Sequence, residues 1–166
     1  RERISPRPAP PVLDRDVLDA RLALSCIASG LPPGAIVVEE APTARDPMHA
    51  HLRVDRKDSF YTTASGGLGY AMPAAVGIAL GRPGERVVAI LGDGSAMYGI
   101  QALFAAFQLA LPITFIVLNN RRYDALRLFG ETFGMWHVVG TDLAGLDFCA
   151  LAQGHGLPAG RQVTTA

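Results

Sequence analysis

Two short polar turns, each placed directly after an apolar run, constrain the fold of this chain more than any other feature. Gly92-Asp93-Gly94-Ser95 follows the apolar residues 87–91, and Asn119-Asn120 follows the apolar residues 113–118. Strands that are buried on both faces read as continuous apolar runs, and a helix-length segment separates these two runs, as a parallel connection requires. The pattern predicts two neighbouring parallel strands. Their carboxyl ends would place Asp93 and Asn120 at the edge where open α/β sheets bind ligands.

The chemistry of the two turns indicates a magnesium-diphosphate site. Carboxylate, amide and carbonyl oxygens are hard ligands suited to Mg²⁺, which usually shares its coordination sphere with phosphate groups. Glycine at positions 92 and 94 lets backbone N–H groups approach a diphosphate closely. The sequence has no G-x-x-x-x-G-K-[ST] motif, which excludes a P-loop. The segment from Gly67 to Gly69 supplies only two of the three glycines of a dinucleotide fingerprint.

The rest of the chain predicts a doubly wound architecture. Asp14 or Asp16 is expected to cap a helix that runs to about Ser29, and residues 35–38 read as a buried strand. Residues 61–69 form a glycine-dense crossover. Strands that alternate with helices predict the α/β class, with a mostly parallel sheet and helices on both faces. Residues 43–52 are expected to be helix or loop, and further helices are expected at residues 71–80, 98–110 and 123–129, and from Asp147 to residue 153.

Composition excludes several other classes of protein. Fifteen basic and fifteen acidic residues give a formal net charge of zero, so nucleic-acid binding has no electrostatic support. The apolar residues 102–118 include Gln108 and Pro112, and they read as a helix followed by a buried strand rather than as a membrane span. Cys26 and Cys149 match no metal-ligand spacing and are expected to be buried thiols in a reducing cytoplasm.

The two turns and their spacing resemble the diphosphate-binding domain of thiamine-diphosphate-dependent enzymes. The signature of that family is Gly-Asp-Gly, then just under thirty residues, then Asn-Asn, and here Asp93 and Asn120 are 27 positions apart. The segment GGLGYAMPAA at residues 66–75 and the stretch 92–127 most resemble the benzoylformate-decarboxylase type. The resemblance covers roughly residues 13–160 and implies thiamine diphosphate and Mg²⁺ as cofactors.

The resemblance also implies roles for individual residues. The Mg²⁺ ligands would be the side chains of Asp93 and Asn120 and the main-chain carbonyl of Arg122. The Gly66 carbonyl would contact the cofactor's aminopyrimidine, and the bulky side chain of Leu68 would hold the two rings in a bent conformation. The residues expected at the diphosphate are Gly92, Gly94, Ser95 and Tyr123, with Thr43 on the opposite side.

By the same resemblance, residues after the second turn would bind substrate. Ala125, Leu126 and Phe129 would line a pocket for the aromatic ring of a 2-oxo acid, although their spacing on one helix is equally that of a core-facing stripe. In the family, the glutamate that activates the cofactor lies on a separate pyrimidine-binding domain, usually of a neighbouring subunit. The resemblance therefore implies a homo-oligomer, dimer or tetramer, and an isolated chain without catalytic activity.

The domain reading follows from the same comparison of patterns. Residues 1–12, which contain four prolines, are expected to be an interdomain linker. Residues 13–166 would form the diphosphate-binding domain, incomplete at its carboxyl-terminal end. The implied activity is the non-oxidative conversion of benzoylformate to benzaldehyde and CO₂. Two alternatives stay open, namely an acetolactate-synthase-like carboligase domain and a truncated remnant that binds cofactor without catalysis.

Overall fold

A computed structural model describes residues 18–158 and 160–165, and its centre is a four-stranded, fully parallel sheet. The predicted linker at residues 1–12 lies outside the described residues. The carboxyl ends of the three longer strands are level, because Glu40 pairs with Leu91 and Gly92 pairs with Leu118. The strand order is β2 (Phe60–Thr62), β1 (Ile36–Glu40), β3 (Val87–Gly92) and β4 (Ile113–Leu118).

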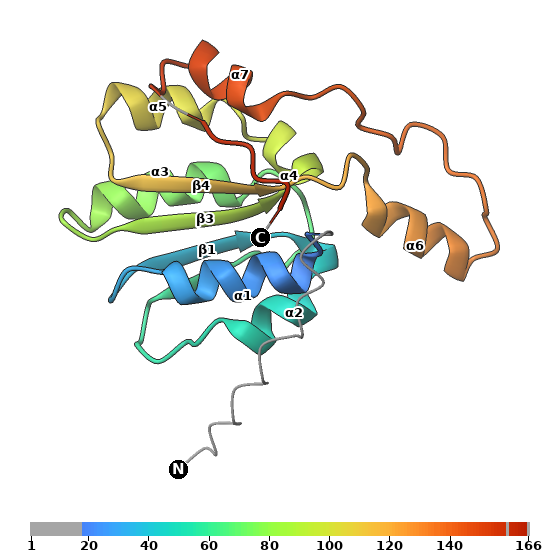
Figure 1. Ribbon diagram of the computed structural model, residues 1–166, viewed down its shortest axis with the longest axis horizontal. Coiled ribbons are helices and arrows are strands. Elements are labelled where there is room, and N and C mark those ends of the chain that lie inside the picture. Colours follow the sequence, from blue (N-terminus) through green and yellow to red (C-terminus); the bar gives the residue numbers. More distant parts are fainter. Residues whose placement is uncertain (1–17, 159, 166) are drawn as a thin grey trace.

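Helices cover both faces of this sheet, which confirms the doubly wound α/β prediction (Figure 1). On one face lie α1 (Ala20–Gly30), the short 3₁₀ helix η1 (Pro42–Ala44) and α2 (Arg45–His51). On the other face lie α3 (Ala71–Gly81), α5 (Ala102–Gln108) and α7 (Phe148–Gly154). The short helix α4 (Asp93–Met97) begins directly at the end of β3, and α6 (Asp124–Thr132) projects from the side of the molecule.

Alternation along the central strands builds a separate core on each face of the sheet. Successive side chains of a strand point to opposite faces, so a strand buried on both sides is apolar at every position. In β1, Ile36 and Val38 pack in the cluster beneath α3 and α5, whereas Val37 packs with Leu24 and Met48 on the α1 and α2 side. This double burial explains why the apolar runs in the sequence are continuous.

Four expectations about local structure are corrected by the structure. Helix α1 is capped by Asp19, whose Oδ1 accepts the Leu22 N–H at 2.7 Å, and not by Asp14 or Asp16, which lie outside the described residues. The helix expected at residues 98–110 is shorter, since α5 spans Ala102–Gln108, and a separate helix, α4, which was not expected, starts directly at Asp93. Strand β2 was expected to be part of the crossover; only three residues long, it gives too short a pattern to recognise. Cys26 is exposed on α1 rather than buried.

One expected helix start is confirmed. Helix α7 begins after Asp147, whose Oδ1 accepts the Ala150 N–H at 2.9 Å, as the sequence predicts. None of the helices in the part of the chain that the structure describes is both long and apolar enough to cross a membrane.

Candidate functional site

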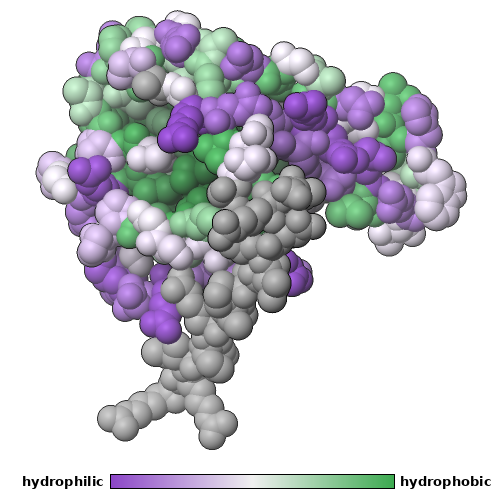
Figure 2. Space-filling view, in the orientation of Figure 1, coloured by the Kyte–Doolittle hydropathy of each residue, from purple (hydrophilic) through white to green (hydrophobic). Residues whose placement is uncertain are grey.

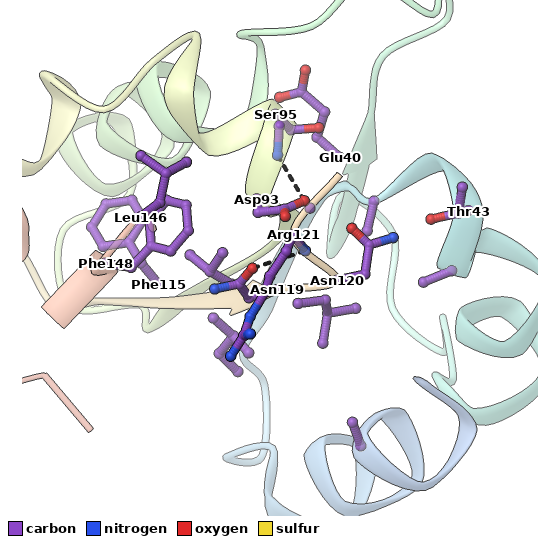
Figure 3. Close-up of a pocket in the computed structure, with 18 of the residues that line it drawn as sticks. Glu40, Thr43, Asp93, Ser95, Phe115, Asn119, Asn120, Arg121, Leu146 and Phe148 are labelled. Carbon is purple, nitrogen blue, oxygen red and sulfur yellow. Dashed lines mark hydrogen bonds between the residues drawn. The ribbon is translucent and has the colours of Figure 1, made fainter. Parts of the chain in front are cut away.

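The carboxyl ends of the strands open into a cleft of about 2120 Å³, and it collects most of the residues singled out from the sequence. Figure 3 shows Asp93 close to Ser95 on one side and to Asn119 and Asn120 on the other, with Thr43 facing them from a separate segment. Of the predicted site residues, only Phe129 is absent from the cleft lining. Those that line it are Thr43, Gly66, Leu68, Gly92, Asp93, Gly94, Ser95, Asn120, Arg122, Tyr123, Ala125 and Leu126.

The Asp93 carboxylate is fixed at the bottom of this site. Its side chain belongs to the first residue of α4 and is 2% exposed. The Gly94 N–H donates to Oδ1 at 2.9 Å, and the Arg122 N–H donates to Oδ2 at 3.1 Å. A buried carboxylate is costly unless such hydrogen bonds compensate it, so these two contacts define where its oxygens lie.

Asn120 brings a second oxygen to the same place. Its Oδ1 accepts the same Arg122 N–H at 3.3 Å, so the oxygens of Asp93 and Asn120 converge on one backbone group. Within the described residues no three His, Cys, Asp or Glu side chains cluster as a metal site. A cation here would therefore be held by carboxylate, amide and main-chain carbonyl oxygens, a donor set that fits Mg²⁺ and not a soft metal.

The turn that carries Asn120 is held by a segment that contains no recognisable motif. Arg121 adopts a left-handed conformation with φ of 62°, and its N–H donates to Asn119 Oδ1 at 3.1 Å. The Arg121 carbonyl accepts the Leu143 N–H at 2.8 Å, and the Tyr123 N–H donates to the Thr141 carbonyl at 2.7 Å. Residues 141–143 therefore fasten both ends of the turn. These contacts pair backbone N–H and C=O groups, which every residue type except proline can supply, so no local motif could have revealed them.

Tyr123 closes the site over Gly94. A Cβ atom built on Gly94 would lie 2.4 Å from Tyr123 Cε1, so only glycine lets the ring approach so closely. The ring also meets Tyr98 edge to face, with centroids 6.4 Å apart. Burial raises the pKa of the Tyr123 phenol, and the neighbouring Tyr98 and Asp93 raise that pKa further. Tyr98, which also lines the cleft, was not identified from the sequence.

The crossover before α3 forms another wall of the cleft. Gly66 adopts φ of 71°, in the left-handed region that glycine enters without strain, and Leu68 is half-buried beside it. Glu40 is 1% exposed at the end of β1 and accepts hydrogen bonds from the N–H groups of Gly69 and Ala71. Its neighbour Glu39 is also fully buried, on the other face of the sheet. Neither glutamate was given a role from the sequence.

The predicted substrate residues lie on α6, outside the packed body of the domain (Figure 1). Leu126 is 53% exposed and Phe129 is 62% exposed, and Phe129 contacts Phe133 with ring centroids 4.8 Å apart. The stripe on α6 is therefore not a core face of the described structure. Ala125 and Leu126 face the cleft, whereas Phe129 lies beyond its lining.

Comparison with known proteins decides the family. Residues 44–166 match the family described as "Thiamine pyrophosphate enzyme, C-terminal TPP binding domain". The chain belongs to this family. Thiamine pyrophosphate is another name for thiamine diphosphate, so the resemblance seen in the two turns is confirmed.

Individual relatives place the chain near the benzoylformate decarboxylases of that family. It is 39% identical to benzoylformate decarboxylase of Pseudomonas aeruginosa over 154 residues, which are 92% of this chain and 29% of the relative. It is 30% identical to the large subunit of acetolactate synthase isozyme 2 of Escherichia coli, over 86% of this chain and 26% of that protein. The solved thiamine diphosphate-dependent 4-hydroxybenzoylformate decarboxylase of Rhodococcus jostii RHA1 superposes with a TM-score of 0.81 at 40% identity, over 85% of this chain and 27% of that one. The chain thus spans less than a third of the length of each of these relatives.

Proposed function

We propose that this chain is the domain that anchors diphosphate and Mg²⁺ in a thiamine-diphosphate-dependent, non-oxidative 2-oxo acid decarboxylase of the benzoylformate type. The observation that carries the proposal is the convergence of the Asp93 and Asn120 side-chain oxygens on the Arg122 N–H, at the carboxyl edge of a parallel sheet. Two hard oxygens from neighbouring strand ends, beside a glycine-lined backbone, are what a magnesium-diphosphate group requires.

In this proposal Mg²⁺ is held by the Asp93 and Asn120 side chains and by the carbonyl of Arg122. Gly92, Gly94 and Ser95 offer backbone and hydroxyl donors to the diphosphate. The residues expected to complete its surroundings are Tyr123, which stays protonated at its phenol, and Thr43, which lines the cleft from η1.

The crossover positions the remainder of the cofactor. The Gly66 carbonyl would accept a hydrogen bond from its aminopyrimidine, and Leu68 would fix the angle between its two rings. Bound thiamine diphosphate supplies an electron sink, which takes up the electron pair released when the carboxylate of a 2-oxo acid leaves as CO₂. The residues of this chain bind and orient that group.

Two features support an aryl-substituted 2-oxo acid as substrate. Ala125 and Leu126 present apolar side chains to the cleft from α6, and Phe129 follows on the same helix. The chain is also more similar to the two benzoylformate decarboxylases, at 39% and 40% identity, than to the acetolactate synthase, at 30%. Benzoylformate would yield benzaldehyde and CO₂.

The catalytic unit of the proposal is larger than this chain. A pyrimidine-binding domain, contributed by a neighbouring subunit of a homo-oligomer in the cytoplasm, would complete the cofactor site. An acetolactate-synthase-like carboligase is the second candidate, favoured by the 30% identity to the Escherichia coli protein. Release of benzaldehyde from benzoylformate by the assembled enzyme supports the first candidate, and condensation of two pyruvate molecules supports the second.

The anchoring role is tested by calorimetric titration of the 166-residue chain with thiamine diphosphate, with and without Mg²⁺. We expect weak binding that depends on Mg²⁺ and that weakens by at least roughly 100-fold in Asp93→Ala, because even groups one layer outside a metal's ligands change its affinity by 10- to 100-fold. The matched control is Asp55→Ala, which removes an exposed aspartate outside the cleft. Equal affinity in Asp93→Ala and in the unchanged chain would refute the assignment.

A further inference from the structure

We infer that Glu40 is a positioning residue, which fixes the crossover bearing Gly66 and Leu68 in register with the metal-binding turn at Asp93. The inference rests on the proposed function, since that function gives Leu68 its place beside the cofactor rings and Asp93 its place at Mg²⁺. Glu40 itself would touch neither the cofactor nor the substrate.

The buried Glu40 carboxylate is bound by two backbone N–H groups. Its side chain is 1% exposed, and each carboxylate oxygen accepts one backbone N–H, Oε1 from Gly69 at 2.6 Å and Oε2 from Ala71 at 2.7 Å. Hydrogen bonds to an ionised acceptor are short and about twice as strong as neutral ones. A buried carboxylate without such partners would be strongly destabilising, so the crossover and the carboxylate hold each other in place.

These two donors lie directly after Leu68 and at the start of α3. Gly69 directly follows Leu68, and Ala71 is the first residue of α3. Gly66 and Leu68 therefore lie on a short segment whose carboxyl-terminal end is tied to β1 at both residues 69 and 71. Because β1 pairs with β3 in a fixed register, these hydrogen bonds also fix the position of the crossover relative to the strand that ends at Gly92.

A line of contacts connects the crossover to the metal-binding turn. Gly69 has φ of 101°, and a Cβ atom on it would lie 3.1 Å from Tyr98 Cβ, so the crossover rests against Tyr98. Tyr98 meets the ring of Tyr123 edge to face, and Tyr123 covers Gly94, the neighbour of Asp93. Movement of the crossover would thus displace Leu68 and would alter the contacts of the Tyr98 and Tyr123 rings.

Glu39 offers a matched control within the same strand. It is as deeply buried as Glu40 but points to the opposite face of the sheet, because successive strand residues alternate. There it accepts hydrogen bonds from Thr62 and from Arg45 Nε, the latter at 2.9 Å, and so holds the end of β2 and the start of α2 instead of Gly69 and Ala71. Glu39→Gln and Glu40→Gln each remove one buried charge from adjacent positions, but only the second disturbs the contacts to Gly69 and Ala71.

The experiment measures the position of Leu68 relative to the metal site in solution. The 166-residue chain is labelled at leucine methyl groups, and Mn²⁺ with thiamine diphosphate replaces Mg²⁺ as a paramagnetic probe. We expect Mn²⁺ affinity to be similar in Glu40→Gln, Glu39→Gln and the unchanged chain. The paramagnetic relaxation of the Leu68 methyl groups should change in Glu40→Gln and stay unchanged in Glu39→Gln.

Amide hydrogen exchange gives a second readout. In Glu40→Gln the amide oxygen can still accept one N–H but the NH2 group cannot, so exchange at one of Gly69 and Ala71 should accelerate roughly 10- to 100-fold, the factor that corresponds to the loss of a hydrogen bond to a charged group. If Glu40→Gln does not fold, Glu40→Asp replaces it, since a carboxylate one methylene shorter cannot reach both N–H groups. The inference would be overturned if the relaxation of the Leu68 methyl groups is unchanged in the variant at position 40, or if it changes equally in Glu39→Gln. Failure of Mn²⁺ to bind the unchanged chain would instead refute the proposed function.

Discussion

At the scale of single residues, the contact between Gly94 and Tyr123 makes the sharpest prediction. Gly94→Ala would place a methyl group 2.4 Å from Tyr123 Cε1 in the present structure, so the ring must move. We expect a loss of about 1–3 kcal/mol in the free energy of unfolding, the usual cost of overpacking, together with weaker Mg²⁺-dependent binding of thiamine diphosphate. Denaturant unfolding and calorimetry measure the two effects.

The control for this prediction is Gly77→Ala in α3. Nothing lies within 4 Å of a Cβ atom at that position, and the residue is exposed on a helix. Alanine there should stabilise the domain by about 0.5–1 kcal/mol, because glycine is the poorer helix former. If Gly94→Ala is tolerated as well as Gly77→Ala, the close packing of Tyr123 on the turn is not present in solution.

At the scale of elements, the start of α1 depends on one side chain. Asp19 Oδ1 accepts the Leu22 N–H at 2.7 Å, and this contact satisfies one of the free donors of the first turn. Asp19→Ala should lower the free energy of unfolding by about 1 kcal/mol, whereas Asp19→Asn, which keeps a capping oxygen, should cost only a few tenths. Thermal or urea unfolding of the two variants distinguishes this cap from the aspartates at 14 and 16 that the sequence suggested. An equal loss in both variants would argue against the cap.

Helices α1 and α6 should respond in opposite ways to truncation of an apolar side chain. Leu24 in α1 is fully buried, and Leu24→Ala should cost about 2–5 kcal/mol of unfolding free energy. Phe129 in α6 is 62% exposed, and Phe129→Ala should cost less than about 1 kcal/mol. Chemical unfolding of both variants tests this contrast. A large loss of unfolding free energy in Phe129→Ala would show that α6 packs as a core helix, and it would remove support for placing α6 at a substrate pocket.

At the scale of the whole molecule, the cleft extends from the site along the free edge of β4. Among the described strands, β4 pairs only with β3, and its residues line the cleft together with α1 and α7. Figure 2 shows this face hollowed, with apolar residues on its floor. Large exposed apolar surfaces promote association. The purified chain is therefore expected to elute in size-exclusion chromatography as more than a monomer at high concentration.

In the proposed function the cofactor site is shared between two domains, and this limits what the purified chain can catalyse. In the proposed function the chain supplies the diphosphate side of the cofactor site, and Glu39 and Glu40, both committed to buried contacts, are not free to act on the pyrimidine. Catalysis requires the fully assembled set of groups around the transition state. We therefore expect no CO₂ release from benzoylformate by the 166-residue chain with thiamine diphosphate and Mg²⁺. Release that disappears in Asn120→Ala would show that the chain is catalytically complete.

The sequence by itself determined the sheet edge, the two turns and the family, because these depend on local patterns. Residues 87–91 and 113–118 read as buried parallel strands, and the spacing of Asp93 and Asn120 was sufficient to predict a diphosphate site at the ends of these strands. Only the tertiary structure decided which backbone groups hold that site. The Arg122 N–H donates to the side-chain oxygens of Asp93 and Asn120, and residues 141–143 fasten the turn through main-chain hydrogen bonds, whose backbone groups are not specific to a residue type. The same is true of Glu40, whose partners lie 29 and 31 residues away in the chain. Residue types and spacings are written in the sequence, but contacts between distant backbone groups exist only once the chain has folded.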